Sequence, residues 1–314
     1  MNELLLLYKQ NVSILYNKCN VLINQIKRSN MMIRVKNTYI SNAIRNYNDS
    51  VASLKTKYIA DIARIQQQQQ QPKKRRALLI GINYYGTPYQ LDGCITDVQS
   101  LNDKFNGSYD IEIITDLTNK KPTRSVILTE FSALLESANS GDTVLFTFSG
   151  HGSGTTDLNR DEIDGQDEMI ISSDLYGVID DDFNTIIRQK LKTGATLIAL
   201  FDSCHSGTML DLKYSYPSYT VSVLATTNNA DDTNGTVILI SGCLDDQTSA
   251  EAVIVGGKVS GAMTWSFLEA LKQQPTSWNT LLTNMRTLLN ASGFNQIPQL
   301  TSGRPLNTSS PILL

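Results

Sequence analysis

The hydrophobic pattern of the chain changes near residue 72. Over residues 1–65, Leu, Ile, Val, Met and Tyr recur at roughly helical spacing, with no Pro or Gly between them. This spacing predicts one or more long amphipathic helices, with a coiled coil as the more specific alternative. Because the heptad is irregular, we favour plain helices. Six glutamines at 66–71 and then Pro72 form a low-complexity segment that we interpret as a linker.

From Arg75 onward, short apolar runs alternate with helical stretches. The predicted strands are 77–83, 111–115, 143–149, 169–172, 196–202 and 236–242, and the predicted helices lie near 95–106, 123–139, 181–192, 261–274 and 277–290. Continuous apolar strands that alternate with helices indicate an α/β fold with a mostly parallel sheet covered on both faces. We therefore expect a helical N-terminal region over 1–72 and an α/β domain over 73–314.

Cysteine usage and hydropathy narrow the cellular setting. The four cysteines, at positions 19, 94, 204 and 243, have no C-x-x-C spacing, which argues against a zinc site or a disulfide framework. The N-terminal sequence lacks the basic flank and long apolar core of a signal peptide, and no apolar stretch reaches membrane-spanning length. We expect a cytoplasmic protein with no membrane span.

Charge is divided unevenly along the chain. Residues 1–76 contain 14 Lys and Arg against 3 Asp and Glu, whereas the remainder contains 13 against 27. Such asymmetry is typical of an interaction tail for an anionic partner, and it is equally typical of a basic arm attracted to its own acidic body. The sequence leaves both interpretations open.

The only two histidines follow predicted strands. His151 lies in SGHG directly after 143–149, and His205 lies beside Cys204 directly after 196–202. Neighbouring residues of a strand point to opposite faces, so His205 is poorly placed to act on Cys204, and His151 is the better partner. Two parallel strands ending side by side would bring the two turns into contact.

The pairing of His151 with Cys204 would have a chemical purpose. An imidazole promotes the thiolate and later protonates a leaving amine, while backbone N–H groups in the SGHG turn and beside Cys204 would stabilise an oxyanion. The alternative is that Cys204 is a small buried hydrophobe and His151 a turn residue. The place of both in Gly-rich turns after strands favours catalysis.

These motifs, SGHG and DSCHSG, resemble the catalytic signatures of the metacaspases, which are caspase-like cysteine peptidases. LDGCITDV (91–98), DEIDGQDEMI (161–170), VIDDDF (178–183) and SGCLDDQTSAE (241–251) are also similar and occur in order. The resemblance covers about residues 75–314 and is closest to type I members. It implies a caspase-like three-layer α/β/α sandwich, with a large-subunit-like region over about 73–212, a linker over about 213–235 and a small-subunit-like region over about 236–314.

The resemblance also implies an activity. It assigns His151 as general base and Cys204 as nucleophile of a calcium-dependent endopeptidase that cleaves after Arg or Lys and is made as a self-processing zymogen. The family's specificity pocket corresponds to Cys94, Asp97, Ser149 and Asp202. Two carboxylates suit this role because they pair well with a guanidinium or ammonium group. A turn or helix-cap carboxylate is the alternative for Asp202.

An acidic stretch provides candidate calcium ligands. Residues 161–182 contain nine carboxylates. Calcium prefers several oxygen ligands from separated carboxylates, and the resemblance implies that the ligands are Asp167, Asp180, Asp181 and Asp211. The alternative is a solvated acidic loop.

The sequence is also compatible with two other functions. A catalytically silent caspase-like scaffold could bind partners through the basic helical arm, and a paracaspase-type protease would share the arginine specificity. For the peptidase we expect a monomer with protein or peptide substrates and no nucleic-acid partner. The candidate autocleavage sites are Lys213, the one basic residue of 212–235, and the KKRR run at 73–76; the alternative is that no autocleavage occurs.

Overall fold

The computed structural model describes residues 2–70, 73–156, 166–204, 209–216, 224–225, 231–242, 251–253 and 259–314. The chain forms two compact units, Met1–Pro72 and Lys73–Leu314. His205 and Cys243, as well as all of the acidic residues between 157 and 165, lie outside the described residues.

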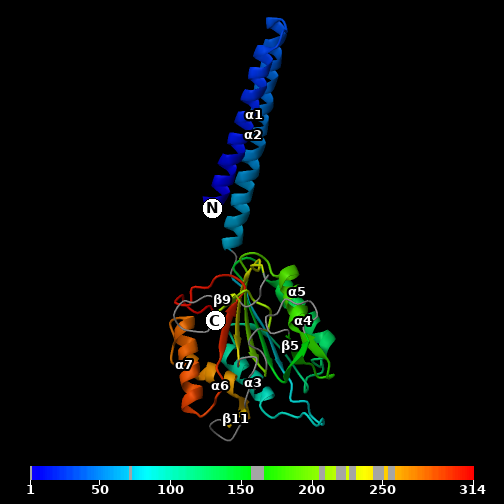
Figure 1. The fold of residues 1–314 in the computed structure, drawn as a ribbon, viewed down its shortest axis with the longest axis vertical. Coiled ribbons are helices and arrows are strands. Elements are labelled where there is room, and N and C mark those ends of the chain that lie inside the picture. Colours follow the sequence, from blue (N-terminus) through cyan, green and yellow to red (C-terminus); the bar gives the residue numbers. More distant parts are fainter. Residues whose placement is uncertain are drawn as a thin grey trace. The chain divides into compact units, whose positions relative to one another are not determined.

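The first unit is an antiparallel helical hairpin of α1 (Asn2–Arg28) and α2 (Ile33–Gln70) (Figure 1). Tyrosines join the two helices: the rings of Tyr8 and Tyr58 stack with centroids 4.8 Å apart, and those of Tyr16 and Tyr47 meet edge to face at 6.3 Å. The glutamine tract is helical as far as Gln70, and the boundary between the two units follows Pro72, at the end of the predicted linker segment. Glutamine is a good helix former, and the sequence of α2 contains no Pro or Gly.

The second unit is organised around an eight-stranded sheet with the order β2-β1-β3-β7-β10-β13-β8-β9. The neighbours from β2 to β10 are parallel, and those from β10 to β9 are antiparallel. The strands are β1 (Arg75–Gly81), β2 (Asp110–Thr115), β3 (Thr143–Ser149), β7 (Thr196–Asp202), β8 (Tyr214–Ser215), β9 (Leu224–Ala225), β10 (Thr236–Ser241) and β13 (Gln299–Ser302).

Helices cover both faces of this sheet (Figure 1). They are α3 (Cys94–Phe105), α4 (Arg124–Ser137), α5 (Asp180–Lys190), α6 (Ala262–Lys272) and α7 (Trp278–Ala291). Because successive side chains of a strand point to opposite faces, Leu78 and Ile80 of β1 pack in one core with Phe183 of α5. Leu79 packs in the other core with Phe267 of α6. The predicted three-layer α/β/α sandwich with a mostly parallel sheet is confirmed.

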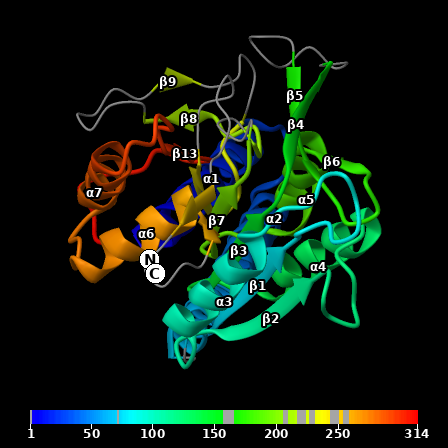
Figure 2. The same cartoon turned by 90° about the horizontal axis from the view of Figure 1, so that it is seen from below.

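A small antiparallel sheet lies beside the central one and consists of β4 (Gly152–Thr156), β5 (Gln166–Ile171) and β6 (Gly177–Ile179) (Figure 2). The strand predicted at 169–172 therefore exists, but it pairs with β4 and β6 rather than with the parallel strands. A further two-stranded ribbon, β11 (Glu251–Val253) and β12 (Val259–Gly261), precedes α6. β12 brings residues near 260 to the start of α3.

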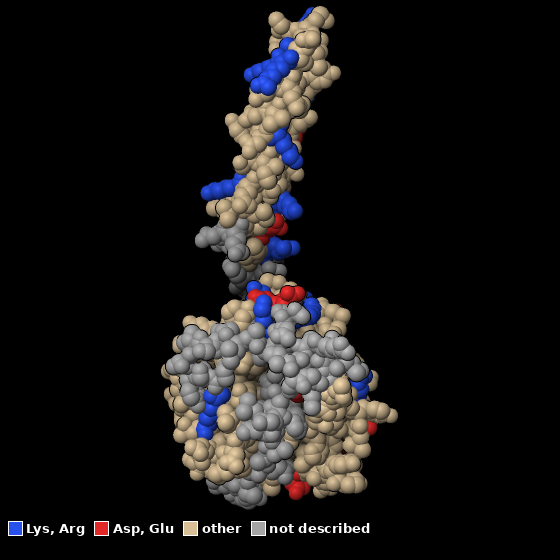
Figure 3. Space-filling view, in the orientation of Figure 1, with Lys and Arg blue, Asp and Glu red and all other residues tan. Residues whose placement is uncertain are grey.

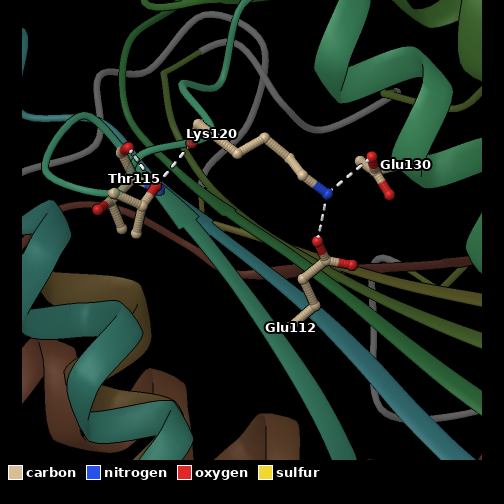
Figure 4. Close-up of polar contacts among 5 residues, drawn as sticks. Glu112, Thr115, Lys120 and Glu130 are labelled. Carbon is tan, nitrogen blue, oxygen red and sulfur yellow. Dashed lines mark hydrogen bonds and ion pairs between the residues drawn. The ribbon is translucent and has the colours of Figure 1, made fainter.

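The loop after β2 is fastened by one lysine. The ammonium of Lys120 lies 2.6 Å from Glu112 Oε1 on β2 and 2.9 Å from Glu130 Oε1 on α4 (Figure 4). Ion pairs this exposed contribute at most about 1 kcal/mol each, but they fix a loop that carries Asp116. The carboxylate of Asp116 accepts the N–H of Asn83 at 3.0 Å, and Asn83 begins the loop that faces the site.

Candidate active site

The two polar turns lie side by side because their strands are neighbours in register. β3 and β7 are parallel, and their last paired residues are Ser149 and Asp202. His151 and Cys204 each follow two residues later. The N–H of Gly150 donates to the carbonyl of Asp202 at 3.3 Å, which extends the pairing into the turns. The predicted meeting of the two turns is therefore present.

Glycine is required where the turns touch. A Cβ on Gly152 would lie 2.0 Å from the carbonyl oxygen of Cys204, a separation that side chains do not adopt. A Cβ on Gly150 would lie 2.8 Å from the hydroxyl of Tyr84. The lack of side chains at both positions lets the backbone that carries His151 approach the Cys204 turn.

The imidazole of His151 has a defined hydrogen-bond partner. Its Nε2 lies 2.7 Å from the carbonyl oxygen of Tyr89. A carbonyl oxygen only accepts hydrogen bonds, so Nε2 carries the proton and the neutral ring presents Nδ1 as its basic atom. The ring also packs on Tyr84, with centroids 4.8 Å apart.

Two backbone N–H groups of the SGHG turn already have partners. Gly150 donates to Asp202, and His151 donates to the hydroxyl of Tyr84 at 2.9 Å. Gly152 is paired with Ile170 of β5. In the neighbouring pair, His151 with Ile171, the N–H of Ile171 donates to the carbonyl of His151. Hydrogen-bonded and non-bonded pairs alternate along antiparallel strands, so the Gly152 N–H points away from β5. Of the expected oxyanion donors in this turn, Gly152 is the one that this alternation favours.

His151 and Cys204 line one pocket of about 110 Å³ together with all four predicted specificity residues. Cys94 and Asp97 come from the first turn of α3, and Ser149 and Asp202 end β3 and β7. Gly261, at the end of β12, closes the pocket beside them. Asp97 is fully buried and Asp202 almost so.

Hydrogen bonds orient both carboxylates of the pocket. Ser149 Oγ donates to Asp97 Oδ2 at 2.6 Å, and Ser260 Oγ donates to Asp97 Oδ1 at 2.5 Å. The N–H of Gly261 also donates to Asp97 Oδ1, at 2.9 Å, and Thr264 N–H donates to Asp202 Oδ2 at 2.8 Å. Burial, and then the charge of Asp202, raise the pKa of Asp97 to about 7, although the hydrogen bonds oppose the shift. Two buried carboxylates this close favour a cation between them.

Several residues of the site were not predicted. Ser260, Gly261 and Thr264 hold the carboxylates, and Tyr84 and Tyr89 hold His151. Their signal in the sequence was limited to a glycine before a helix and a polar, aromatic loop after β1. Only the packing of the folded chain reveals which groups they meet.

The expected calcium ligands are partly gathered. Asp180 begins α5, and its carboxylate accepts the N–H of Glu168 at 2.7 Å and of Asp181 at 2.9 Å. Burial, then the charges of Asp211 and Asp167, raise the pKa of Asp180 to about 8. Crowded buried carboxylates of this kind fit a hard dication in charge and donor chemistry. Even so, no three His, Cys, Asp or Glu side chains within the described part of the chain are positioned as a ready metal site.

The candidate processing sites are held in local structure. Lys213 precedes β8, and its ammonium lies 3.2 Å from Asp232. In the KKRR run, Arg75 and Arg76 already belong to β1, and the N–H of Lys74 donates to Asp142 at 2.8 Å. Lys73 is the residue of this run that precedes these contacts. Cleavage at either site would require local opening.

A three-layer sandwich in which His and Cys turns follow neighbouring parallel strands defines a caspase-like fold. A model of the family described as "Metacaspase, peptidase C14 domain" matches residues 75–213. Metacaspase-1 of Meyerozyma guilliermondii is 36% identical over 287 residues, covering 73% of this chain and 70% of that protein. Metacaspase-1 of Scheffersomyces stipitis is also 36% identical over 287 residues, covering 73% and 71%. The chain belongs to the metacaspase family of cysteine peptidases.

A solved structure supports the fold independently. Protein GSU0716 from Geobacter sulfurreducens superimposes with a TM-score of 0.57 at 23% identity, covering 76% of this chain and 97% of that one. Such a likeness concerns architecture alone. Among the helices that the structure describes, none is both long and apolar enough to cross a membrane.

Proposed function

We propose that the chain is a calcium-dependent endopeptidase that cleaves after Arg or Lys, with His151 as base and Cys204 as nucleophile. The observation that supports this proposal best is the register of β3 and β7, because it brings the turns after both strands to one pocket. Asp97 and Asp202 line that pocket. In the first step His151 Nδ1 takes the proton of Cys204 Sγ. The thiolate then attacks the carbonyl carbon of the scissile peptide bond.

The remaining steps follow from the same groups. The tetrahedral oxyanion would receive the N–H of Gly152, and the imidazolium would donate its proton to the leaving amine as the C–N bond breaks. The carbonyl of Tyr89 stabilises the imidazolium through Nε2–H. Water, deprotonated by His151, then releases the acyl group from Cys204 and restores the thiol.

Specificity would come from charge. Asp97 and Asp202 are buried and mutually repelling, so a substrate guanidinium or ammonium relieves an unfavourable field that no neutral side chain would relieve. An Asp side chain would add a third negative charge to the same pocket. Cys94 and Ser149 would line the path of the substrate stem.

Calcium would be held by Asp167, Asp180, Asp181 and Asp211. When bound, it would neutralise the repulsion that, together with the larger effect of burial, raises the pKa of Asp180. Asn184 of α5 donates to the carbonyls of Leu210 and Asp211 at 2.7 and 3.2 Å. The segment that follows the nucleophile turn is thus already attached to the helix that carries Asp180.

We propose further that the protein is made as a self-processing zymogen, acts as a monomer and is located in the cytoplasm. Cleavage after Lys213, whose ammonium is paired with Asp232, would create a new chain end directly before β8. The cysteine spacing suits a reducing compartment. The alternative, a silent scaffold that binds partners through the hairpin, differs in one measurable property, because it predicts no turnover.

The deciding experiment measures hydrolysis of fluorogenic Arg, Lys and Asp peptides in calcium and in chelator. Wild type should cleave the Arg and Lys peptides in calcium only, and Cys204→Ala should lose at least about a thousandfold in kcat. Asp180→Ala should need much more calcium, whereas Asp182→Ala, which removes a carboxylate paired with Arg124 at 2.5 Å, should keep the wild-type response. Turnover by Cys204→Ala would reject Cys204 as the nucleophile, and full activity in chelator would reject the calcium dependence.

A further inference from the structure

The hydroxyl of Tyr84 lies between two strands that would otherwise pair directly. The N–H of Ile171, at the end of β5, donates to the carbonyl of His151 at 2.9 Å. In an antiparallel pair that exchanges two bonds, the His151 N–H would donate back to the carbonyl of Ile171. Instead it donates to Tyr84 Oη at 2.9 Å, and this hydroxyl donates to the Ile171 carbonyl at 2.6 Å.

We propose that Tyr84 is a positioning residue for His151. The phenol of Tyr84 holds the histidine turn apart from β5 and orients the imidazole toward Cys204. This inference rests on the proposed function, because it assumes that His151 is the base. One direct hydrogen bond is replaced by a two-bond bridge through a phenol oxygen, which must widen the gap between His151 and β5 on that side. The same side chain also packs against the imidazole, with ring centroids 4.8 Å apart and ring planes tilted by 38°.

The chemistry of the phenol suits this role. Tyr84 is 3% exposed, and burial raises the pKa of its phenol further above the usual range. The hydroxyl therefore stays neutral and keeps one hydrogen to donate and lone pairs to accept. A phenylalanine ring would fill the same volume but would leave the His151 N–H and the Ile171 carbonyl to pair directly or to lose their partners.

The backbone at Tyr84 indicates that the position is specifically held. Its φ of 52° lies in the left-handed region, which is unfavourable for a bulky residue and persists where surrounding contacts impose it. Asp116 supplies such contacts, since its Oδ2 accepts the N–H groups of Asn83 at 3.0 Å and Tyr85 at 3.4 Å. The loop is closed by the Leu91 N–H, which donates to the Asn83 carbonyl at 2.9 Å.

The same loop reaches the other side of the imidazole. The carbonyl of Tyr89, five residues after Tyr84, lies 2.7 Å from His151 Nε2. The Tyr84 phenol thus sets the backbone of His151 while the Tyr89 carbonyl sets the far ring nitrogen. Together they leave Nδ1 as the basic atom for the Cys204 thiol.

The test compares Tyr84→Phe with Tyr216→Phe in the full-length chain. Tyr216 is a matched control because its phenol is also 3% exposed and accepts a backbone N–H, that of Leu306 at 2.7 Å, in a part of the unit outside the pocket. Both variants should lose similar thermal stability. Tyr84→Phe should lower kcat for the Arg peptide about tenfold with KM within about twofold, whereas Tyr216→Phe should keep kcat.

A second readout follows the thiol itself. The rate of Cys204 alkylation by iodoacetamide, measured against pH by peptide mapping, should shift toward the profile of His151→Ala in Tyr84→Phe and should stay unshifted in Tyr216→Phe. A wild-type kcat and alkylation profile in a folded Tyr84→Phe would overturn the positioning role. If Cys204→Ala or His151→Ala kept turnover, the proposed function itself would fail, whatever Tyr84→Phe showed.

Discussion

The two units of the chain use their apolar side chains differently. In the hairpin, Leu6, Val21 and Ile59 are each more than half exposed, and its buried apolar side chains among those described are Ile26 and Ala43. On the face drawn in Figure 3, uncharged atoms dominate the hairpin, with Lys and Arg scattered along it. The second unit instead packs two continuous cores against the two faces of its sheet. The hairpin is thus specified by local helix pattern, and the site depends on long-range packing.

The largest effect should come from matched truncations in the two units. Phe183 is fully buried, with ring centroids 5.0 Å from Phe131 and 5.9 Å from Phe201. Phe183→Ala should therefore cost about 3–5 kcal/mol of unfolding free energy. Tyr58→Ala removes a stacked ring at the hairpin surface and should cost about 1 kcal/mol.

Different probes separate the two transitions. Both tryptophans, Trp265 and Trp278, belong to the second unit, so their fluorescence during denaturant unfolding reports that unit alone, while circular dichroism also reports the hairpin. Phe183→Ala should shift the fluorescence midpoint. If Tyr58→Ala shifted it equally, the two units would not be independent.

The strands that fix the site were the most predictable part of the fold. The runs 143–149 and 196–202 coincide with β3 and β7, because long apolar runs bounded by Gly and polar residues leave little ambiguity. β6, β8 and β12 were missed, since two or three residues are too few to show a period. Their pairing depends on segments distant in the chain.

The site divides in the same way. His151 and Cys204 were predictable because each follows a predicted strand. Ser260 was not, since its bond to Asp97 joins residues 163 positions apart, and Tyr84 was not, since its phenol meets a backbone N–H 67 positions away. Residue type and local pattern identify groups that do chemistry, whereas the groups that hold them are defined by tertiary contacts.

An effect of intermediate size on catalysis is expected from Asp97→Asn. This variant tests whether the buried carboxylates that long-range packing brings into the pocket determine the specificity for Arg and Lys. Removing one charge-assisted partner should lower kcat/KM for Arg and Lys peptides by about 10–100-fold. Asp142→Asn is the control, because Asp142 is a buried carboxylate before β3, at the opposite end of the sheet. Asp142→Asn should have the wild-type selectivity between Arg and neutral peptides. Unchanged selectivity in Asp97→Asn would show that Asp97 does not bind the substrate side chain.

The pH dependence of the same variant has a defined sign. Because the folded-state pKa of Asp97 is raised from 3.8 to about 7, the unfolded chain releases this proton first. Stability from this group is full below about pH 4 and declines as pH rises toward about 7. In wild type, KM for an Arg peptide should fall as pH rises through about 7, and Asp97→Asn should lose both trends. Retention of either trend in the variant would assign it to another group.

The smallest effect should come from deleting residues 1–72, which removes 10 Lys and Arg against 3 Asp and Glu and leaves 17 against 27. If the basic hairpin competes with cationic substrates for the acidic unit, the deletion should raise activity about two- to threefold at low salt. At physiological salt the gain should shrink, because exposed charges are screened over about 8 Å.

The activity at low salt of full-length protein with Lys55→Gln and Lys57→Gln, both exposed on α2, should lie between those of the full-length and deleted proteins. The tryptophan unfolding midpoint should be the same in all three proteins. Equal activity of deleted and full-length protein at every salt concentration would mean that the hairpin acts on another molecule, and its exposed apolar side chains would then be the surface to examine.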